Sequence, residues 1–143
     1  MLRVGDVSSV NYENGTVRVA FFDMNNIVSS EIPMLSNEYN IPDVGDTVAC
    51  IMYNHGNSKG ICLGSFYNSS NKDPDGAEEL YIKRFLSEGY IKYSKASKTL
   101  TIASDAVAII GNVTITGNLD VSGDISATGD ISAVGTVSGS NIP

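Results

Sequence analysis

The most regular pattern of apolar and polar residues lies in the C-terminal third of the chain. From Gly111 onward glycine recurs at every sixth position, and an aliphatic residue follows each glycine two places later. The residue two places further on is again apolar or small, and Asn, Asp, Thr or Ser separates the two. Alternation with period two is typical of a strand with one buried face, and glycine allows a sharp corner because it tolerates positive φ. The pattern therefore predicts a β-helix of short strands and corners.

The two predicted inward positions of each six-residue unit form two rows along the tail. The first row is Val113, Leu119, Ile125, Ile131 and Val137, and the second is Ile115, Val121, Ala127, Ala133 and Gly139. The second row loses side-chain volume toward the C-terminus, and packed interiors tolerate few voids, so we expect a body that narrows. A disordered Gly/Ser/Thr/Asp tail is the alternative. The strict register and the fixed places of the β-branched residues favour the ordered, tapering needle.

Three chains suit this tail better than one. Five six-residue units give one chain too little apolar interior, because solenoids need several stacked repeats. Single-chain left-handed β-helices usually carry an aliphatic residue before each glycine, whereas three of the five residues there are polar. Three intertwined chains share an interior and cover their sheet edges, so we predict a parallel homotrimer. Its core is predicted to be Val113, Ile115, Leu119, Val121, Ile125, Ile131 and Val137.

The first 68 residues show short alternating runs separated by turn residues. The predicted strands are 2–12, 16–23, 27–35, 47–53 and 60–67. Asn14-Gly15 is a strong hairpin signal, because both central residues of a type I′ turn need positive φ. Pro33 is expected at a strand end or edge. Five short strands without helical periodicity predict an all-β domain, and their number favours an OB-fold-like Greek-key barrel.

The chain divides into four predicted segments. Residues 1–68 form the barrel, 69–79 a linker, 80–110 a collar of β-strands at the base of the β-helix, and 111–143 the hexapeptide-repeat spike and its tip. The collar is expected to contain strands at 80–85, 90–93, 99–103 and 106–110. It also carries Lys83, Arg84, Lys92, Lys95 and Lys98. These basic residues form either a solvated surface or ion pairs with acidic groups of neighbouring chains.

Composition excludes several classes of function. The net charge of −7 and the absence of a basic run argue against nucleic acid as a partner. No apolar stretch has the length of a membrane span or the character of a signal-peptide core, so we expect synthesis in the cytoplasm of the producing cell. Cys50 and Cys62 lie in apolar runs and are expected as buried free thiols. The single histidine, His55, lies in a predicted turn without a nucleophile or metal motif, so we expect no enzyme activity, cofactor or metal.

Several segments of the barrel resemble one family. They are residues 3–7, 15–19, 41–48 with Pro-Asp-Val-Gly-Asp-Thr-Val, and 60–68 with Gly-Ile-Cys-Leu-Gly-Ser-Phe-Tyr-Asn. In this order, followed by the glycine repeat, they resemble the phage baseplate assembly protein V family. That family comprises the central spikes of contractile phage tails, related bacteriocin particles and type VI secretion spikes.

The resemblance implies a structural role at the baseplate tip of a virion or phage-tail-like particle. The barrel would dock to the tail hub or tube, and sheath contraction would drive the needle through the target cell envelope. Many family members ligate iron at the tip through a His-x-His pair near the C-terminus. No histidine follows His55 here, so that iron site is not carried over. The predicted tip is Asn141, Ile142 and Pro143, closed either by Ile142 packing around the axis or by a separate tip-capping protein.

Two other classes of protein are alternatives to a spike. A hexapeptide-repeat acyltransferase needs a longer coil, a catalytic histidine between subunits and aliphatic residues before each glycine, and this chain has none of these. An OB-fold protein trimerised by the β-helix, binding oligosaccharide or a receptor in a tail or fibre, is the second. The acidic barrel disfavours oligonucleotides but leaves sugars open.

Overall fold

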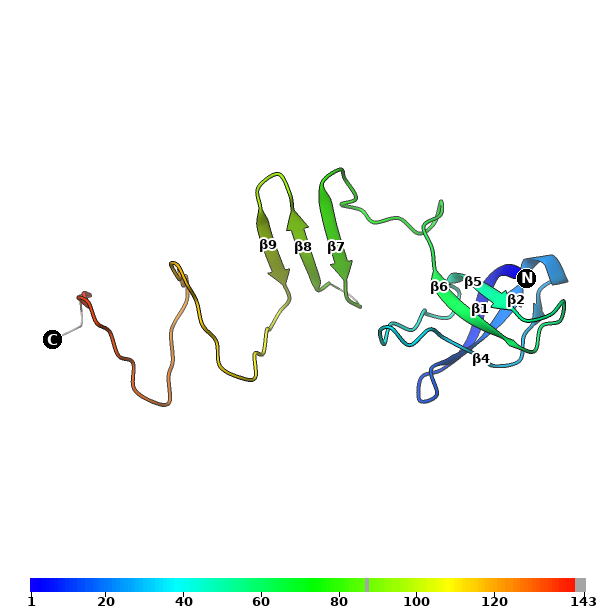
Figure 1. The fold of residues 1–143 in the computed structure, drawn as a ribbon, viewed down its shortest axis with the longest axis horizontal. Helices are drawn as coiled ribbons and strands as arrows, with labels where there is room; N and C mark the ends of the chain where they lie inside the picture. The colour runs from blue at the N-terminus through cyan, green and yellow to red at the C-terminus, as the bar shows by residue number, and fades with distance from the viewer. Residues whose placement is uncertain (87, 141–143) are drawn as a thin grey trace. The chain divides into compact units, whose positions relative to one another are not determined.

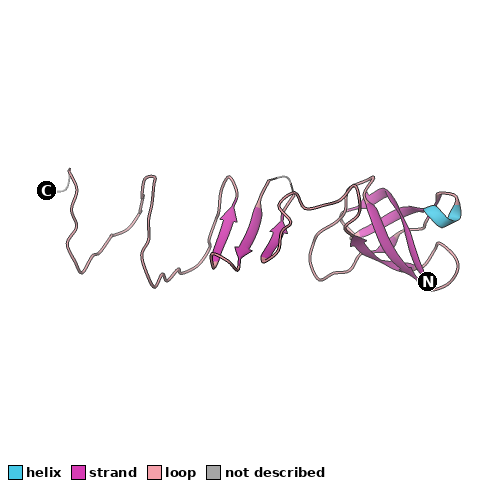
Figure 2. Ribbon diagram, turned by 90° about the horizontal axis from the view of Figure 1, so that it is seen from above, coloured by secondary structure: helices cyan, strands magenta, loops and turns pink. Residues whose placement is uncertain are grey.

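The computed structural model describes residues 1–86 and 88–140, and this part of the chain is all-β. Figure 1 shows two groups of strands followed by a long tail, and Figure 2 shows a short 3-10 turn, Phe22–Met24, as the one helical element drawn. The chain separates into two compact units, Met1–Ala103 and Ser104–Pro143. The predicted all-β class is therefore confirmed, and all the paired strands are antiparallel neighbours.

The N-terminal sheet has six strands. They are β1 (Leu2–Asn11), β2 (Thr16–Phe21), β3 (Ile27–Val28), β4 (Ile32–Pro33), β5 (Thr47–Met52) and β6 (Gly60–Ser65). Their order is β3-β2-β1-β5-β6, and β4 also pairs with β2. Each strand falls within a predicted run, but the run 27–35, predicted as one strand, contains the two short strands β3 and β4. Pro33 ends β4, as expected of a residue that lacks a backbone donor.

Two turns show how asparagine and glycine shape this sheet. The turn between β1 and β2 spans residues 12–15, and of its residues only Gly15 has a positive φ, of 62°. The predicted two-residue type I′ turn is therefore wrong: Asn11 Oδ1 accepts a hydrogen bond from Asn14 N at 3.1 Å and stabilises a longer loop. Asn25 and Asn26 both have positive φ, of 51° and 59°, at the predicted turn before β3.

The segment that follows β4 contacts β6, the last strand in the order of the sheet. Met34, next to β4, forms a parallel bridge with Cys62 of β6. Leu35 N donates a hydrogen bond to Cys62 O at 3.2 Å. Because β4 pairs with β2 at one end of the path and β6 is the other end, the sheet wraps around a common interior.

The core inside this sheet comes from alternate residues of neighbouring strands. Burial alternates residue by residue in β2 and β5, as the period-two pattern predicted. The buried apolar side chains are Val7, Val17, Val19, Phe21, Ile32, Val48, Cys50, Met52 and Cys62. The predicted burial of both cysteines is therefore confirmed, and both are free thiols.

One charged residue, Arg3, is also buried against the N-terminal sheet. Its guanidinium forms an ion pair with Asp23 through Nη1 and donates from Nη2 to His55 O at 2.6 Å. It lies 5.8 Å from the centre of the Phe21 ring. Such contacts compensate for the loss of hydration that burial imposes on a charge. They also join β1 to the 3-10 turn and to the loop around His55, whose side chain is exposed as expected.

The second sheet has three antiparallel strands in the order β7-β8-β9. They are β7 (Leu80–Arg84), β8 (Tyr90–Ser94) and β9 (Thr99–Ala103). These agree with three of the four strands predicted for the collar. The fourth prediction, a strand at 106–110, is wrong for the single chain, since these residues make no ladder with any described segment. A strand requires a neighbour to accept and donate its hydrogen bonds.

Candidate functional site: the two apolar rows of the C-terminal repeats

The tail follows the six-residue period of its glycines. Among residues 104–140, the backbone bends at 111, 117, 122–123, 128–129 and 134–135, with straighter runs between them (Figure 1). Gly111 and Gly117 have φ of +140° and +136°, which side chains rarely adopt. A Cβ at these two glycines would meet nothing within 4 Å, so conformation rather than crowding favours glycine there. The predicted corners are therefore present.

The backbone of the tail is unpaired within its own chain. No described residue from 104 to 140 takes part in a hydrogen bond. Native proteins satisfy the great majority of their backbone N–H and C=O groups, mostly within secondary structure. The straight runs thus present donors and acceptors along their length that neighbouring strands can bind.

The two predicted rows are exposed in the single chain. The exposed fractions of their large apolar side chains range from 46% for Val121 to 74% for Ile131. Ile110 and Val134, which precede glycines and were not predicted to face inward, are fully exposed at 100% and 109%. The large side chains of the rows are therefore less exposed than Ile110 and Val134. The exposed members of the predicted core are Val113, Ile115, Leu119, Val121, Ile125, Ile131 and Val137.

The predicted tip cannot be added to this description. Asn141, Ile142 and Pro143 lie outside the described residues.

Basic residues of the three-stranded sheet form ion pairs with acidic residues of the same chain. Arg84 donates to both carboxylate oxygens of Asp73 at 2.8 Å and to Asp75 at 2.6 Å. This hydrogen bonding lowers the pKa of Asp73 and raises the pKa of Arg84. Lys83 Nζ lies 2.6 Å from Glu38 Oε1, which raises the pKa of Lys83.

Lys95 also forms an ion pair, with its Nζ 3.4 Å from Glu79 Oε1. Lys92 differs, since its Nζ lies 5.4 Å from the centre of the Tyr90 ring. Three of the five basic side chains of the collar are therefore paired with acids of their own chain. These intrachain pairs had not been predicted, because their acidic partners lie 9 to 45 residues earlier in the chain.

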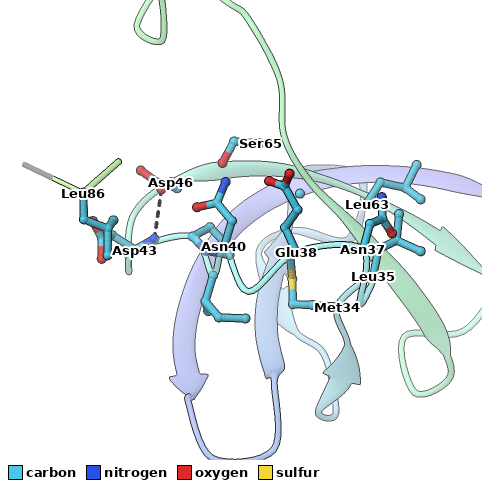
Figure 3. Close-up of a pocket in the computed structure, with 13 residues that line it drawn as sticks. Met34, Leu35, Asn37, Glu38, Asn40, Asp43, Asp46, Leu63, Ser65 and Leu86 are labelled. Atoms are coloured by element: carbon cyan, nitrogen blue, oxygen red, sulfur yellow. Dashed lines mark hydrogen bonds between the residues drawn. The ribbon is translucent and has the colours of Figure 1, made fainter. Parts of the chain in front are cut away.

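A small pocket opens beside the loop that precedes β5 (Figure 3). Its volume is about 300 Å³, and Glu38, Asp43 and Asp46 give its wall an acidic character. Asp43 N donates to Asp46 Oδ2 at 2.9 Å, the contact drawn as a dashed line in Figure 3. Its lining includes Ser65 but no histidine, cysteine or lysine, so it lacks the usual partners of an activated nucleophile.

A larger pocket has exposed aromatic walls. It has a volume of about 610 Å³, and its aromatic lining residues are Tyr12, Tyr39 and Phe85. Tyr39 Oη donates to Tyr12 O at 3.1 Å, which links the two tyrosines. This grouping could not be predicted from the sequence, because the three residues come from separate turns and strand ends.

Metal-binding clusters and membrane-spanning helices are absent from the part of the chain that the structure describes. No group of three or more His, Cys, Asp or Glu side chains is arranged to hold a metal ion there. No helix in residues 1–86 or 88–140 has the length and apolar character needed to cross a membrane.

No family model matches the chain, and no curated protein matches it either.

Proposed function

We propose that this protein is the trimeric central spike of a contractile injection apparatus, in a phage tail or a phage-tail-like bacteriocin. One observation carries the proposal: residues 104–140 combine two exposed apolar rows with a backbone that makes no hydrogen bond in the single chain. Association with further copies of the tail would bury the apolar rows and would also pair the backbone groups.

Three tails wound together would bury the rows and pair the backbones at the same time. Their rows meet around a shared axis and leave water, which stabilises the assembly by about 25 cal/mol for each Å² of apolar surface buried. Their backbones pair between chains, so no sheet edge remains free along the length of the needle. Ile110 and Val134, which are fully exposed in the single chain, stay outside the shared interior. The loss of volume from Ile115 to Ala133 narrows the interior toward the C-terminus.

The pairing order of the N-terminal sheet supports an OB-fold-like barrel as the docking domain. β1 pairs with both β2 and β5, and the parallel bridge from Met34 to Cys62 joins the ends of the path. Five-stranded Greek-key barrels of this kind close in a similar way. In the proposed spike, three barrels present a blunt end to the tail hub or tube.

The needle works mechanically rather than chemically. Chains that share backbone hydrogen bonds and one interior separate slowly, because local opening requires many contacts to break together. Such a rod transmits an axial load to the target cell envelope. The energy of penetration comes from contraction of the sheath, as the family resemblance implies.

Labelling of particles tests this function directly. An antibody against the barrel is applied to contractile particles made by the cell that encodes the chain, and gold-labelled particles are viewed by electron microscopy. The proposal predicts gold at the baseplate end of the tube only. Particles that form, contract and kill normally after deletion of the coding sequence would contradict it.

The aromatic pocket supports a second candidate. Tyr12, Tyr39 and Phe85 offer the apolar faces with nearby polar groups that line many small-ligand sites. On this alternative the trimer is a tail or fibre protein whose barrel binds an oligosaccharide or receptor. A glycan array probed with the full chain and with Tyr39→Ala distinguishes the two. Binding that the substitution abolishes favours the alternative.

A further inference from the structure

The two cysteines of the chain face each other inside the barrel. Cys50 of β5 is the direct cross-strand partner of Cys62 of β6. Both side chains are completely buried and both are free thiols. Nothing in the proposed spike function uses this pair.

The hydrogen bonds around the cysteines define the type of cross-strand pair. Tyr53 N donates to Lys59 O at 3.0 Å, and hydrogen-bonded pairs recur at every second residue of an antiparallel ladder. Ile51 and Ile61 therefore form the next hydrogen-bonded pair, and Cys50 and Cys62 a non-hydrogen-bonded one. The donation from Leu35 N to Cys62 O confirms that the Cys62 backbone faces the opposite neighbour.

A non-hydrogen-bonded pair suits a disulfide. Its Cα atoms lie about 4.5 Å apart and its side chains point together, whereas disulfides span Cα separations of roughly 4.4–6.8 Å. The bond between two sulfur atoms can thus form without a large shift of either strand. The interaction between the two thiols also raises the pKa of Cys50 and lowers that of Cys62.

The pair lies at the seam where the sheet closes. β6 pairs along its length with β5, but the described residues join it to the other end of the path through the isolated bridge at Met34. A sparse seam opens locally more easily than a continuous ladder, because fewer hydrogen bonds must break. Small oxidants can reach the buried sulfur atoms through such openings.

We propose that Cys50 and Cys62 form a redox-controlled staple, a cross-strand disulfide made when the barrel meets a hydroperoxide. The thiolate of one cysteine attacks one peroxide oxygen, the O–O bond breaks, and that cysteine becomes a sulfenic acid while the departing oxygen takes up a proton. The sulfur of the other cysteine then attacks the sulfenic sulfur, the S–O bond breaks, and water leaves with the proton of the second thiol. Two thiols and one hydrogen peroxide thus give one disulfide and two waters.

Intact mass and thermal unfolding of the full chain test the staple. The reduced protein is treated with hydrogen peroxide under native conditions. Its mass should fall by two hydrogen atoms per chain, and no thiol should react with a thiol reagent after denaturation. The loop that the disulfide closes runs from Cys50 to Cys62, so the Tm of the barrel should rise by roughly 10 °C and return on reduction. Two persistent thiols, added oxygen atoms or disulfide-linked dimers would overturn the proposal.

The single variants Cys50→Ala and Cys62→Ala serve as controls. Each should gain oxygen at its remaining cysteine, lose no hydrogen pair and show no rise in Tm. An equal rise in Tm in either variant would show that stabilisation does not come from the disulfide. The comparison of reduced and oxidised parent protein needs no substitution, so the test holds even if a variant fails to fold.

Discussion

At the scale of single residues, two adjacent phenylalanines of the N-terminal sheet differ sharply in burial. Phe21 ends β2 and is completely buried, whereas Phe22 begins the 3-10 turn and is 51% exposed. We predict that Phe21→Ala lowers the free energy of unfolding by about 3–5 kcal/mol, because it leaves a cavity in the core. Phe22→Ala should cost less than about 1 kcal/mol. Urea denaturation of both variants makes the comparison, and equal losses would contradict this assignment of the core.

The contact between Asp73 and Arg84 makes a pH-dependent prediction. Arg84 lowers the pKa of Asp73. The stability that the ion pair contributes is therefore fully present above the ordinary Asp pKa of about 3.9, and it is lost as pH falls through the lowered pKa. An NMR titration should therefore give Asp73 a midpoint below the ordinary range. Arg84→Gln should return that midpoint to the ordinary range, and Lys95→Gln should leave it lowered. An ordinary midpoint in the parent protein would contradict the contact.

Some of these residue-scale facts follow from the sequence and some do not. Burial of Cys50 and Cys62 could be predicted, because each lies among apolar residues of a strand-like run. Burial of Arg3 could not, since its partners, Asp23 and the His55 carbonyl, come from distant turns. The same holds for Asp73 and Arg84, which meet only because the linker folds back on β7.

At the scale of elements, Gly5 controls how closely β1 approaches β2. A Cβ at this position would run into the backbone oxygen of Ala20 and lie 2.9 Å from the Phe21 Cα. Backbone atoms of a central ladder cannot move aside as a side chain can, so we predict that Gly5→Ala costs about 1–3 kcal/mol. Gly56→Ala, whose nearest neighbour is the flexible Asn54 side chain at 3.1 Å, is the control and should cost less. Thermal melting compares the two, and an unchanged Tm for Gly5→Ala would refute the close approach.

The success of sequence prediction for the strands also depends on scale. Alternation is local, so the strands of the first 103 residues could be placed to within a few residues. The strand predicted at 106–110 failed because a strand exists only beside another one, and the single chain offers no neighbour there. The turn at 12–15 is also longer than predicted, because Asn11 caps it with its side chain.

At the scale of the whole molecule, the rows of the tail can be tested within one repeat. Ile131 belongs to the first row, whereas Val134, three residues later, is fully exposed. Ile131→Asp would place a carboxylate from every chain in the shared interior, which is costly without partners. We predict that this substitution raises the protein concentration at which half of the trimer is dissociated by more than about a hundredfold. Val134→Asp should leave it nearly unchanged.

Sedimentation of the two variants over a range of concentrations measures this difference. Equal dissociation of both would show that the rows do not face a common axis. The sequence alone marks the rows, because their period is strict, but it does not show which residues are fully exposed in the single chain. The contrast between the rows and the fully exposed Ile110 and Val134 comes from the structure.

The central claim, that three chains complete the tail, is tested most directly by the solution mass of the full chain. Light scattering at micromolar concentration should give three times the 15.1 kDa of one chain. A mass of 15.1 kDa would contradict the shared interior and remove the main physical argument for a spike.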